Sequence, residues 1–208
     1  MKAYKTLIHT DIKNIESRTR SELINKISGF KSPVLVGTVN SNGIYNLSII
    51  SSIFHIGSNP PLLGMILRPY TEKYSHTLKN ILSSQQFTIS HIHHELIDQA
   101  HRCSKKFPDN VSEFKCVGLN PILYQQDDWV APAVSESKIR LGLSLNRKID
   151  LPNKCNLIVG NLEWIESHES LLNDNKISFE SNNISVLGLY NYYKNTELLR
   201  LDYQALKE

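Results

Sequence analysis

The sequence predicts a mainly β domain with helices outside the sheet. Three observations lead to this prediction: an Asn-Gly turn at 40–43 between two apolar runs, a short apolar run at 62–67 bounded by prolines, and apolar residues at every second position over 138–149. At 208 residues, the chain is long enough for one substantial core, so we expect a single domain over 1–208.

The N-terminal half of the chain supplies most of these elements. Residues 11–28 place Ile and Leu at loose helical spacing before Gly29, which predicts an N-terminal helix. Next, 33-PVLVGTV-39 reads as a buried strand and 44-IYNLSIISSIF-54 as the strand that returns from the turn. The run 62-LLGMIL-67 predicts a third strand.

The rest of the chain continues this pattern of strands and short helices. Ser75 is suited to cap a helix over 75–84, because Ser is favoured at that position. The further expected elements are strands at 87–92, 138–149 and 155–167 and a helix at 95–107, and the segment 184–201 carries a cluster of tyrosines. We find no internal repeat and no domain boundary.

Composition excludes several classes of protein. The net charge of +3 comes from Lys and Arg spread among acids, unlike the basic stripe of a nucleic-acid-binding protein. Three cysteines without CxxC spacing argue against a disulfide framework and against a zinc site, and they fit a reduced, cytoplasmic compartment. No segment is apolar and long enough for export or for a membrane span, so we expect no membrane partner.

The familiar catalytic motifs are also missing. The sequence contains no GxSxG, HExxH, Walker-type loop or GxGxxG, so a nucleophile on the protein is not indicated. The histidines of 91-HIHH-94 invite a metal site, because His91 and His93 would share one face of a strand. A strand end whose histidines face solvent or hydrogen-bonded partners explains them more simply, and we predict no metal.

The return strand is unusually polar. In 46-NLSIISS-52, alternation places Asn46, Ser48, Ile50 and Ser52 on one side, and neither side is cleanly apolar. Buried hydroxyl and amide groups need hydrogen-bond partners, and a bound polar ligand would supply them. The alternative is that the serines face other backbone groups or an oligomer interface.

A possible anion site follows in the sequence. Arg68 follows the third strand, Lys73 lies in the next loop, and Ser75, His76 and Thr77 open the predicted helix. Free N–H groups and the dipole at a helix start favour an anion, and neighbouring cations add charge. A simple capped surface helix explains the same residues, but the polar strand and the basic loop together suggest a phosphorylated, partly planar ligand.

These segments also resemble a known family. GTVNSNGIYNLSIISSIFHIGSNPPLLGMI, followed by SHTLKNI and QQFTISHI, is similar to the flavin reductase-like family of FMN-binding split-barrel proteins. The likeness continues through EFKCVGL, PAVSES and LIVGNLEWI, and it extends from about Ser32 to Leu201. It implies an antiparallel β-barrel with peripheral helices, a homodimer, and FMN near the dimer interface.

The resemblance assigns roles to individual residues. Asn46, Ser48, Ile49 and Ile50 would line the isoalloxazine ring, and Ser51, Ser52, Arg68 and Lys73 would hold the phosphate. Ser75, His76 and Thr77 at the helix start would complete the site. Tyr190 and Tyr193 would close over the ring or cross to the partner subunit.

The resemblance further implies an oxidoreductase that passes hydride or electrons from NADH or NADPH through FMN to an acceptor. Many members carry a Gly-Asp-His triplet at the start of the late strand, where this chain reads 153-NKCNLIVGNLEW-164 with Cys155 in place of the histidine. This departure favours FMN held as a prosthetic group. The alternative is a non-catalytic FMN-binding protein that stores flavin or senses redox state.

Overall fold

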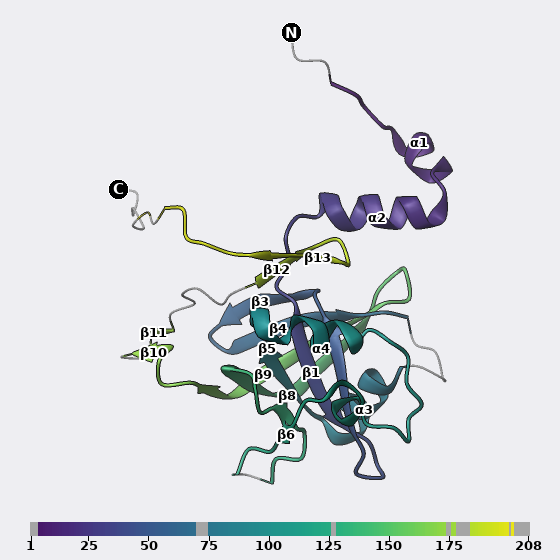
Figure 1. The fold of residues 1–208 in the computed structure, drawn as a ribbon. Coiled ribbons are helices and arrows are strands. Elements are labelled where there is room, and N and C mark those ends of the chain that lie inside the picture. Colours follow the sequence, from purple (N-terminus) through teal and green to yellow (C-terminus); the bar gives the residue numbers. More distant parts are fainter. Residues whose placement is uncertain are drawn as a thin grey trace.

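A seven-stranded antiparallel sheet forms the body of the protein, with short helices around it (Figure 1). The computed structural model describes residues 4–69, 75–125, 128–173, 176–177, 184–199 and 201. The strands of the main sheet are β1 (Val34–Val39), β2 (Tyr45–Ile50), β3 (Ile53–Ser58), β4 (Pro61–Leu67), β5 (Gln86–His91), β8 (Ile139–Asp150) and β9 (Asn156–Ser167). Three two-stranded ladders accompany the sheet: β6 (Pro121–Ile122) with β7 (Ala133–Val134), β10 (Leu172–Asn173) with β11 (Lys176–Ile177), and β12 (Ile184–Leu187) with β13 (Asn191–Lys194).

The helices are short and lie outside the sheet. They are α1 (His9–Asn14), α2 (Ser17–Ile27), α3 (His76–Ser84), the 3₁₀ turn η1 (His94–Leu96), α4 (Ile97–Arg102) and α5 (Glu113–Val117). A mainly β fold with peripheral helices is therefore confirmed.

The sheet closes on itself at one corner. Its strand order is β2-β1-β5-β8-β9-β4-β3, so β2 and β3 are the two edge strands. Only Ser51 and Ser52 separate them in the sequence, and an extended chain gains at most about 3.5 Å per residue, so the two edges meet there. The backbone N–H of Ile66 on β4 donates to Ser52 O at 2.9 Å and fixes the corner. The result is a barrel that is split between β2 and β3.

Two hydrophobic clusters lie on the two faces of the sheet. One contains residues from β1, β4, β5, β8, β9 and α3, with Phe87, Leu143 and Ile158 fully buried. The other packs the opposite faces of β1 and β2 against α4 and α5, around Leu35 and Phe114. Both faces of β2 are therefore packed against other parts of the protein. This accounts for the absence of a strict alternation of apolar and polar residues along the strand.

The structure divides two segments that the sequence pattern predicts as continuous. The predicted helix at 11–28 is two helices, because the Glu16 carboxylate accepts hydrogen bonds from the N–H groups of Arg18 and Thr19, both at 2.9 Å, and so begins α2. The predicted strand at 44–54 is likewise two strands, β2 and β3, because the chain turns at Ser51–Ser52 from one sheet edge to the other. The predicted helix at 95–107 ends early, at Arg102.

An arm of the molecule extends from the barrel. The β12–β13 hairpin joins residues 29–31 through an antiparallel bridge between Lys31 and Val186, and α2 and α1 extend beyond the hairpin on the same side (Figure 1). Neither α1 nor α2 contains a buried residue. Of the 17 exposed large hydrophobic side chains among the described residues, 11 belong to residues 4–30 and 190–201. We call these two segments the arm.

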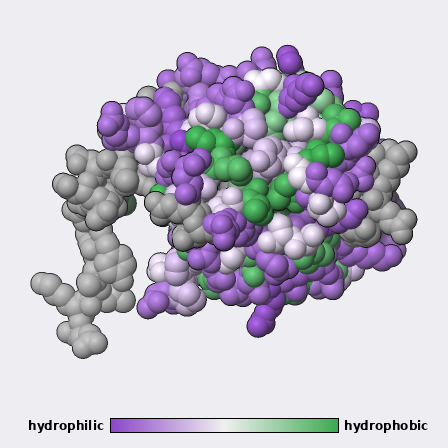
Figure 2. Space-filling model, turned by 90° about the horizontal axis from the view of Figure 1, so that it is seen from below, coloured by the Kyte–Doolittle hydropathy of each residue, from purple (hydrophilic) through white to green (hydrophobic). Residues whose placement is uncertain are grey.

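The barrel itself has a more ordinary surface. Figure 2 shows its lower face, where hydrophobic residues form groups near the middle and hydrophilic residues surround them. Among the described helices, none is long and apolar enough to cross a membrane.

Candidate functional site

Strand β2 and helix α3 bring the predicted polar residues together. Leu47 points into the cluster with α5, so its neighbours Asn46 and Ser48 point to the other face, toward α3. There Ser48 Oγ and Thr77 Oγ1 are 2.6 Å apart and share a hydrogen bond. This bond joins the polar strand to the first turn of α3, and it involves two residues that the sequence predicts for one site.

The hairpin turn and the loop before α5 form the opposite wall. Asn40 Oδ1 accepts hydrogen bonds from the N–H groups of Asn42 and Ile44, both at 2.9 Å, and Gly43 adopts a left-handed φ of +75°. Asn40 Nδ2 donates to Asp109 O at 3.1 Å. The side chain of Asn40 thus shapes the turn and holds the 109–113 loop beside it.

Glu113 is a buried carboxyl group in this wall. Its side chain is 5% exposed, and Oε2 accepts a hydrogen bond from the Leu47 N–H at 3.1 Å. Leu47 belongs to an edge strand, so this bond satisfies a backbone donor that no neighbouring strand reaches. Burial raises the pKa of Glu113 above its usual range, while the backbone N–H groups of Glu113 and Leu47 and the nearby His76 oppose that rise.

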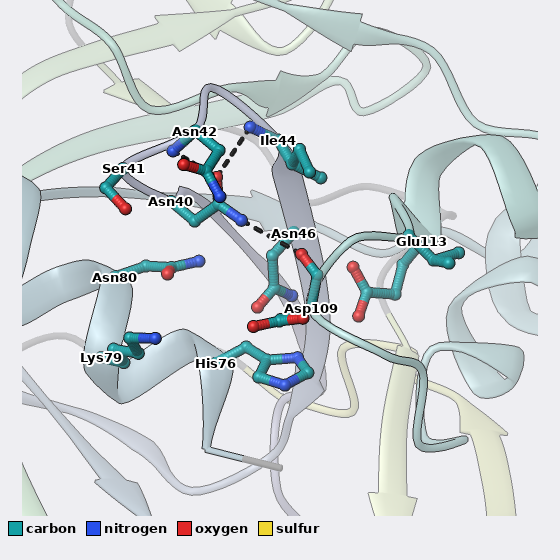
Figure 3. A pocket seen from close by; sticks show the side chains of 11 residues that line it. Asn40, Ser41, Asn42, Ile44, Asn46, His76, Lys79, Asn80, Asp109 and Glu113 are labelled. Carbon is teal, nitrogen blue, oxygen red and sulfur yellow. Dashed lines mark hydrogen bonds between the residues drawn. The ribbon is translucent and has the colours of Figure 1, made fainter. Parts of the chain in front are cut away.

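A pocket lies between these walls (Figure 3). It is an open depression, and its empty space of about 400 Å³ includes open solvent. Its lining residues come from the hairpin, β2, the first turns of α3 and the 109–113 loop: Asn40, Ser41, Asn42, Ile44, Asn46, His76, Lys79, Asn80, Asp109, Val111 and Glu113. The pocket therefore contains two of the residues that the sequence predicts for a flavin site, Asn46 and His76.

Asn46 has an unused acceptor in this pocket. The residue is 5% exposed, and Oδ1 has no hydrogen-bond partner among the described residues. Its Nδ2 makes a long contact of 3.5 Å to Ser48 Oγ. Figure 3 shows the Asn46 amide above the Asp109 carboxylate and the His76 ring. A buried acceptor without a protein partner is rare in folded proteins.

A second group of predicted residues lies at the corner of the barrel. The N–H of Ile66 donates to Ser52 O, and the antiparallel register of β3 and β4, continued past Ile53, places Ser51 opposite Leu67, the residue before Arg68. Ser51 and Ser52 are half-buried and Arg68 is exposed, while Arg68 O accepts from Asn156 Nδ2 at 3.5 Å. Ser51 and Ser52, which follow β2, and Arg68, which follows β4, therefore belong to chain segments that meet at the same corner of the barrel.

The start of α3 contributes to the pocket and contacts β2. Ser75 is the N-cap residue and makes no side-chain cap hydrogen bond, so the cap predicted for it does not form. Thr77 is buried through its contact with Ser48, and His76 lines the pocket. Lys73 lies outside the described residues.

Four other predicted residues are less well placed for a single site. Ile49 and Ile50 pack against opposite hydrophobic clusters, so at most one of their side chains can line a single ring. Tyr193 contacts Phe30 with ring centroids 5.0 Å apart, and Tyr190 contacts His101 at 6.5 Å. Both tyrosines therefore belong to the arm and its contact with α4, and within one subunit they are not among the pocket residues.

The sequence pattern gave no role to the acidic residues of the pocket. Glu113 opens the segment EFKCVGL, which carries the family resemblance, but a single Glu in an amphipathic helix usually faces solvent. Its burial depends on Phe114 and Val117, which bring α5 against β2. Asp109 is placed by the hydrogen bond from Asn40, which joins residues 69 positions apart.

The histidine segment is explained by local contacts. His93 is buried, and its Nε2 hydrogen-bonds with Glu136 O at 3.2 Å. Burial lowers the pKa of His91. Among the described residues, no group of three or more His, Cys, Asp or Glu is arranged to hold a metal ion.

Comparison with known proteins identifies the family. The model of the flavin reductase like domain matches residues 27–191, which is most of the chain. The protein belongs to the flavin reductase-like family. A structure from Shewanella frigidimarina, assigned as a flavin reductase with a split-barrel domain, is 34% identical with a TM-score of 0.89, over 97% of this chain and 100% of that one.

Solved structures of lower sequence identity share the fold. Nitrilotriacetate monooxygenase component B from Bacillus cereus has a TM-score of 0.85 at 22% identity, and an FMN-binding protein from Thermus thermophilus has 0.73 at 15%. Each alignment covers 97% of this chain and 100% of the other. An uncharacterized protein from Aquifex aeolicus is 24% identical over 142 residues, which are 67% of this chain and 70% of that protein. The split-barrel fold is thereby confirmed.

Proposed function

We propose that this protein is an FMN-binding oxidoreductase that passes hydride or electrons from NADH or NADPH through FMN to an acceptor. One observation supports the proposal: the Ser48 hydroxyl on β2 shares a hydrogen bond with the Thr77 hydroxyl at the start of α3, so two of the segments that the sequence nominates for a flavin site are in contact. Membership of a flavin-binding family supports it, and the Thermus thermophilus protein of the same fold binds FMN.

The chemistry of these side chains fits the two ends of FMN. The phosphate needs donors and positive charge, which Ser51, Ser52, Arg68 and the start of the nine-residue helix α3 would offer. The ring needs polar contacts along its pyrimidine edge, which the Asn46 amide near the start of β2 and the Ser48 hydroxyl in its middle would offer. A strand of six residues is long enough to separate a phosphate from a ring.

Bound FMN would supply the redox chemistry by accepting a hydride and releasing electrons one or two at a time. The residues of the chain would bind and orient it. Ser48 and Thr77 would fix the distance between β2 and α3 through their shared hydrogen bond, and α3 would shield one side of the site from water.

We also propose that the protein works as a homodimer. The exposed apolar side chains of the arm support this proposal, because a helix of 11 residues is marginally stable without a surface to cover its apolar side. The three cysteines are all free, which favours a reducing, cytoplasmic compartment.

A visible absorption spectrum of the purified protein, followed by assays with NADH and NADPH, tests the proposed activity. A yellow protein that oxidises either nucleotide is the expected result. A yellow protein that dithionite bleaches but that oxidises neither nucleotide would favour the non-catalytic alternative, for which Cys155 in place of the family's histidine is the supporting observation. A colourless protein whose unfolding temperature does not rise with FMN would exclude both.

The phosphate assignment has its own test. Changing Ser51 and Ser52 together to alanine is expected to weaken FMN more than riboflavin, because only FMN carries the phosphate. Ser58→Ala, an exposed serine at the far end of β3, is the matched control. Equal weakening of both flavins would contradict the assignment.

A further inference from the structure

One part of the outer face of the barrel is apolar and only partly covered. Met65 on β4 points into the cluster around Phe87, so its neighbours Gly64 and Ile66 point to the outer face. The antiparallel registers then bring outward apolar side chains of four neighbouring strands together. Six of them form what we call the sheet patch: Phe54, Ile56, Leu62, Ile66, Leu157 and Ile149.

Within the described residues, the sheet patch is not part of either hydrophobic cluster. Phe54, Ile56 and Ile149 are 43%, 41% and 39% exposed, and the other three residues are half-buried. Gly64 lies beneath the patch: carbon atoms of Phe54 and Ile56 are 2.6 and 3.0 Å from the position that a Cβ would take. Both side chains therefore lie over β4 and present their apolar sides to solvent.

Other parts of the same outer face are covered by the chain itself. Helices α4 and α5 pack against β1 and β2. On β5, Thr88 Oγ1 donates to Pro132 O, and Ser90 Oγ accepts from the Val134 N–H at 3.0 Å, so the segment at 132–134 lies over that strand. The apolar face of a sheet is ordinarily packed against a second layer. The sheet patch lacks such a layer among the described residues.

We propose that the sheet patch binds the arm of a second copy of this protein. This inference rests on the proposed homodimer and adds the surface that receives the arm. Ile24 and Ile27 lie three residues apart on one side of α2 and are 44% and 69% exposed, so the helix presents an apolar side to solvent. The arm and the sheet patch are both left open in the single chain, and one exchange between two copies covers both.

The available areas favour the arm, and not a second sheet patch, as the occupant. Six apolar side chains that are roughly one third exposed offer on the order of 300 Å², whereas a standard interface buries about 800 Å² on each partner. Two sheet patches face to face would therefore fall short of a stable dimer. The arm offers on the order of 1,000 Å² of apolar surface, so a contact between arm and patch reaches the required size.

The arm of the same chain does not cover the sheet patch, because the patch is exposed with the arm in place. The base of the arm is fixed by the bridge between Lys31 and Val186 and by Tyr192, which packs against the cluster of α4 and α5. From this base α2 extends away from the barrel (Figure 1). A pair related by a two-fold axis, in which each subunit gives its arm to the other, is the arrangement that closes.

The Phe54→Ser, Ile56→Ser double variant tests the receiving surface. We expect the dissociation constant of the dimer to rise at least about tenfold, because apolar contacts at the centre of an interface carry most of its binding energy. Leu82→Ser, an exposed residue on α3 outside both surfaces, is the control and should leave the dimer unchanged. Sedimentation of the full-length proteins over a range of concentrations gives the constants. An unchanged constant in a folded patch variant would overturn the inference.

Mixing two impaired variants gives a sharper test. In a mixture of the patch variant with the Ile24→Ser, Ile27→Ser variant, the intact arm of the first chain meets the intact patch of the second. One of the two contacts is then whole, so we expect mixed dimers at concentrations at which each variant alone is monomeric. Mass tags on the two chains identify mixed dimers in native mass spectrometry. Absence of mixed dimers at every concentration would contradict the exchange.

Cross-linking locates the contact in proteins whose apolar surfaces are nearly intact. In a background of Cys116→Ser and Cys155→Ser, one chain carries Ile27→Cys and the other Phe54→Cys. We expect a bismaleimide reagent to join the two chains. Leu82→Cys in place of Phe54→Cys is the matched control and should give little product.

A Phe54→Cys chain that cross-links to itself but not to the Ile27→Cys chain would overturn the inference, because two sheet patches would then face each other. An unmodified protein that stays monomeric at micromolar concentration would overturn it as well. FMN absorbance of the same samples reports separately on the proposed cofactor. A yellow monomer contradicts the inference and leaves the cofactor standing, whereas a colourless dimer with the cross-link between arm and patch contradicts only the cofactor.

Discussion

At the scale of single residues, Glu113 connects the stability of the fold to the pocket. Its carboxyl oxygen satisfies the Leu47 N–H of an edge strand, and the same side chain lines the pocket beside His76. Because burial raises the pKa of Glu113, its protonated form is favoured in the folded protein relative to the unfolded chain. Stability that depends on this residue is therefore a function of pH.

Glu113→Gln isolates this dependence. The pKa of Glu113 in the folded protein lies above the unfolded-state value of 4.5. The protonated side chain therefore contributes fully to stability below pH 4.5, and this contribution is lost as the pH rises through the folded-state pKa. We expect the original protein to lose stability relative to the Gln variant over that range, by at most about 1.4 kcal/mol per pH unit. Urea unfolding at several pH values measures it, and a constant difference between the two proteins would contradict the assignment.

The three cysteines should differ in reactivity. Burial raises the pKa of the Cys103 thiol to about 12, and the nearby Glu113 carboxylate adds to the rise. Cys116 is exposed and Cys155 is half-buried. At pH 8 we expect a thiol reagent to modify Cys116 first and Cys103 only after unfolding, because the thiolate is the reactive form. Mass spectrometry of partly labelled protein gives the order, and early labelling of Cys103 would show that α4 is not packed as described.

At the scale of elements, β1 and the chain before β7 come unusually close. A Cβ on Gly37 would lie 1.9 Å from Pro132 O, which is a backbone atom. Thr88 Oγ1 on β5 donates to the same carbonyl at 2.5 Å. The Pro132 carbonyl is therefore held against the sheet and has no room to move away from Gly37. Glycine at position 37 is therefore required by space, since its φ is not in the left-handed region.

Gly37→Ala is expected to destabilise the protein by about 1–3 kcal/mol or more, because overpacking against a backbone atom forces the strands apart. Gly57→Ala is the matched control on β3, where the nearest atom, Pro60 O, would be 3.4 Å away. Denaturant unfolding of both variants gives the comparison. Similar stabilities for the two would contradict the close approach.

Elements with local signals were predictable from the sequence, and those fixed by distant contacts were not. The Asn-Gly turn, β1, β4 and β9 follow from turn chemistry and apolar runs within a few residues. The break at Ser51–Ser52 depends on the meeting of two sheet edges, which local periodicity does not encode. In the site, polar residues of β2 and α3 were predictable, whereas Glu113 requires the packing of α5 on β2.

At the scale of the whole molecule, the arm is the part whose apolar surface remains open. Phe30 and Tyr193 contact each other, but both are still largely exposed. The exposed apolar area of the arm is on the order of 1,000 Å² by typical side-chain areas, comparable to one side of a standard protein interface. This area is what supports the proposed homodimer.

The Ile24→Ser, Ile27→Ser double variant tests the role of the arm. Both side chains are exposed on α2, so the change should leave the barrel folded and shift the protein from dimer to monomer. Leu82→Ser, an exposed residue on α3 outside the arm, is the control. Sedimentation analysis gives the mass, and an unmodified protein that is monomeric at micromolar concentration would contradict the proposal.

The strand order also has a consequence for synthesis. The β3–β4 hairpin is complete once Leu67 has left the ribosome, but the other edge of β4 pairs with β9, which begins at Asn156. Synthesis proceeds at about 5–20 residues per second, so β9 follows β4 by on the order of 5 to 20 seconds, and the edge of β4 is unpaired until then. During this time the nascent chain exposes an unpaired strand that can join another chain, so a translational pause before Asn156 would favour aggregation.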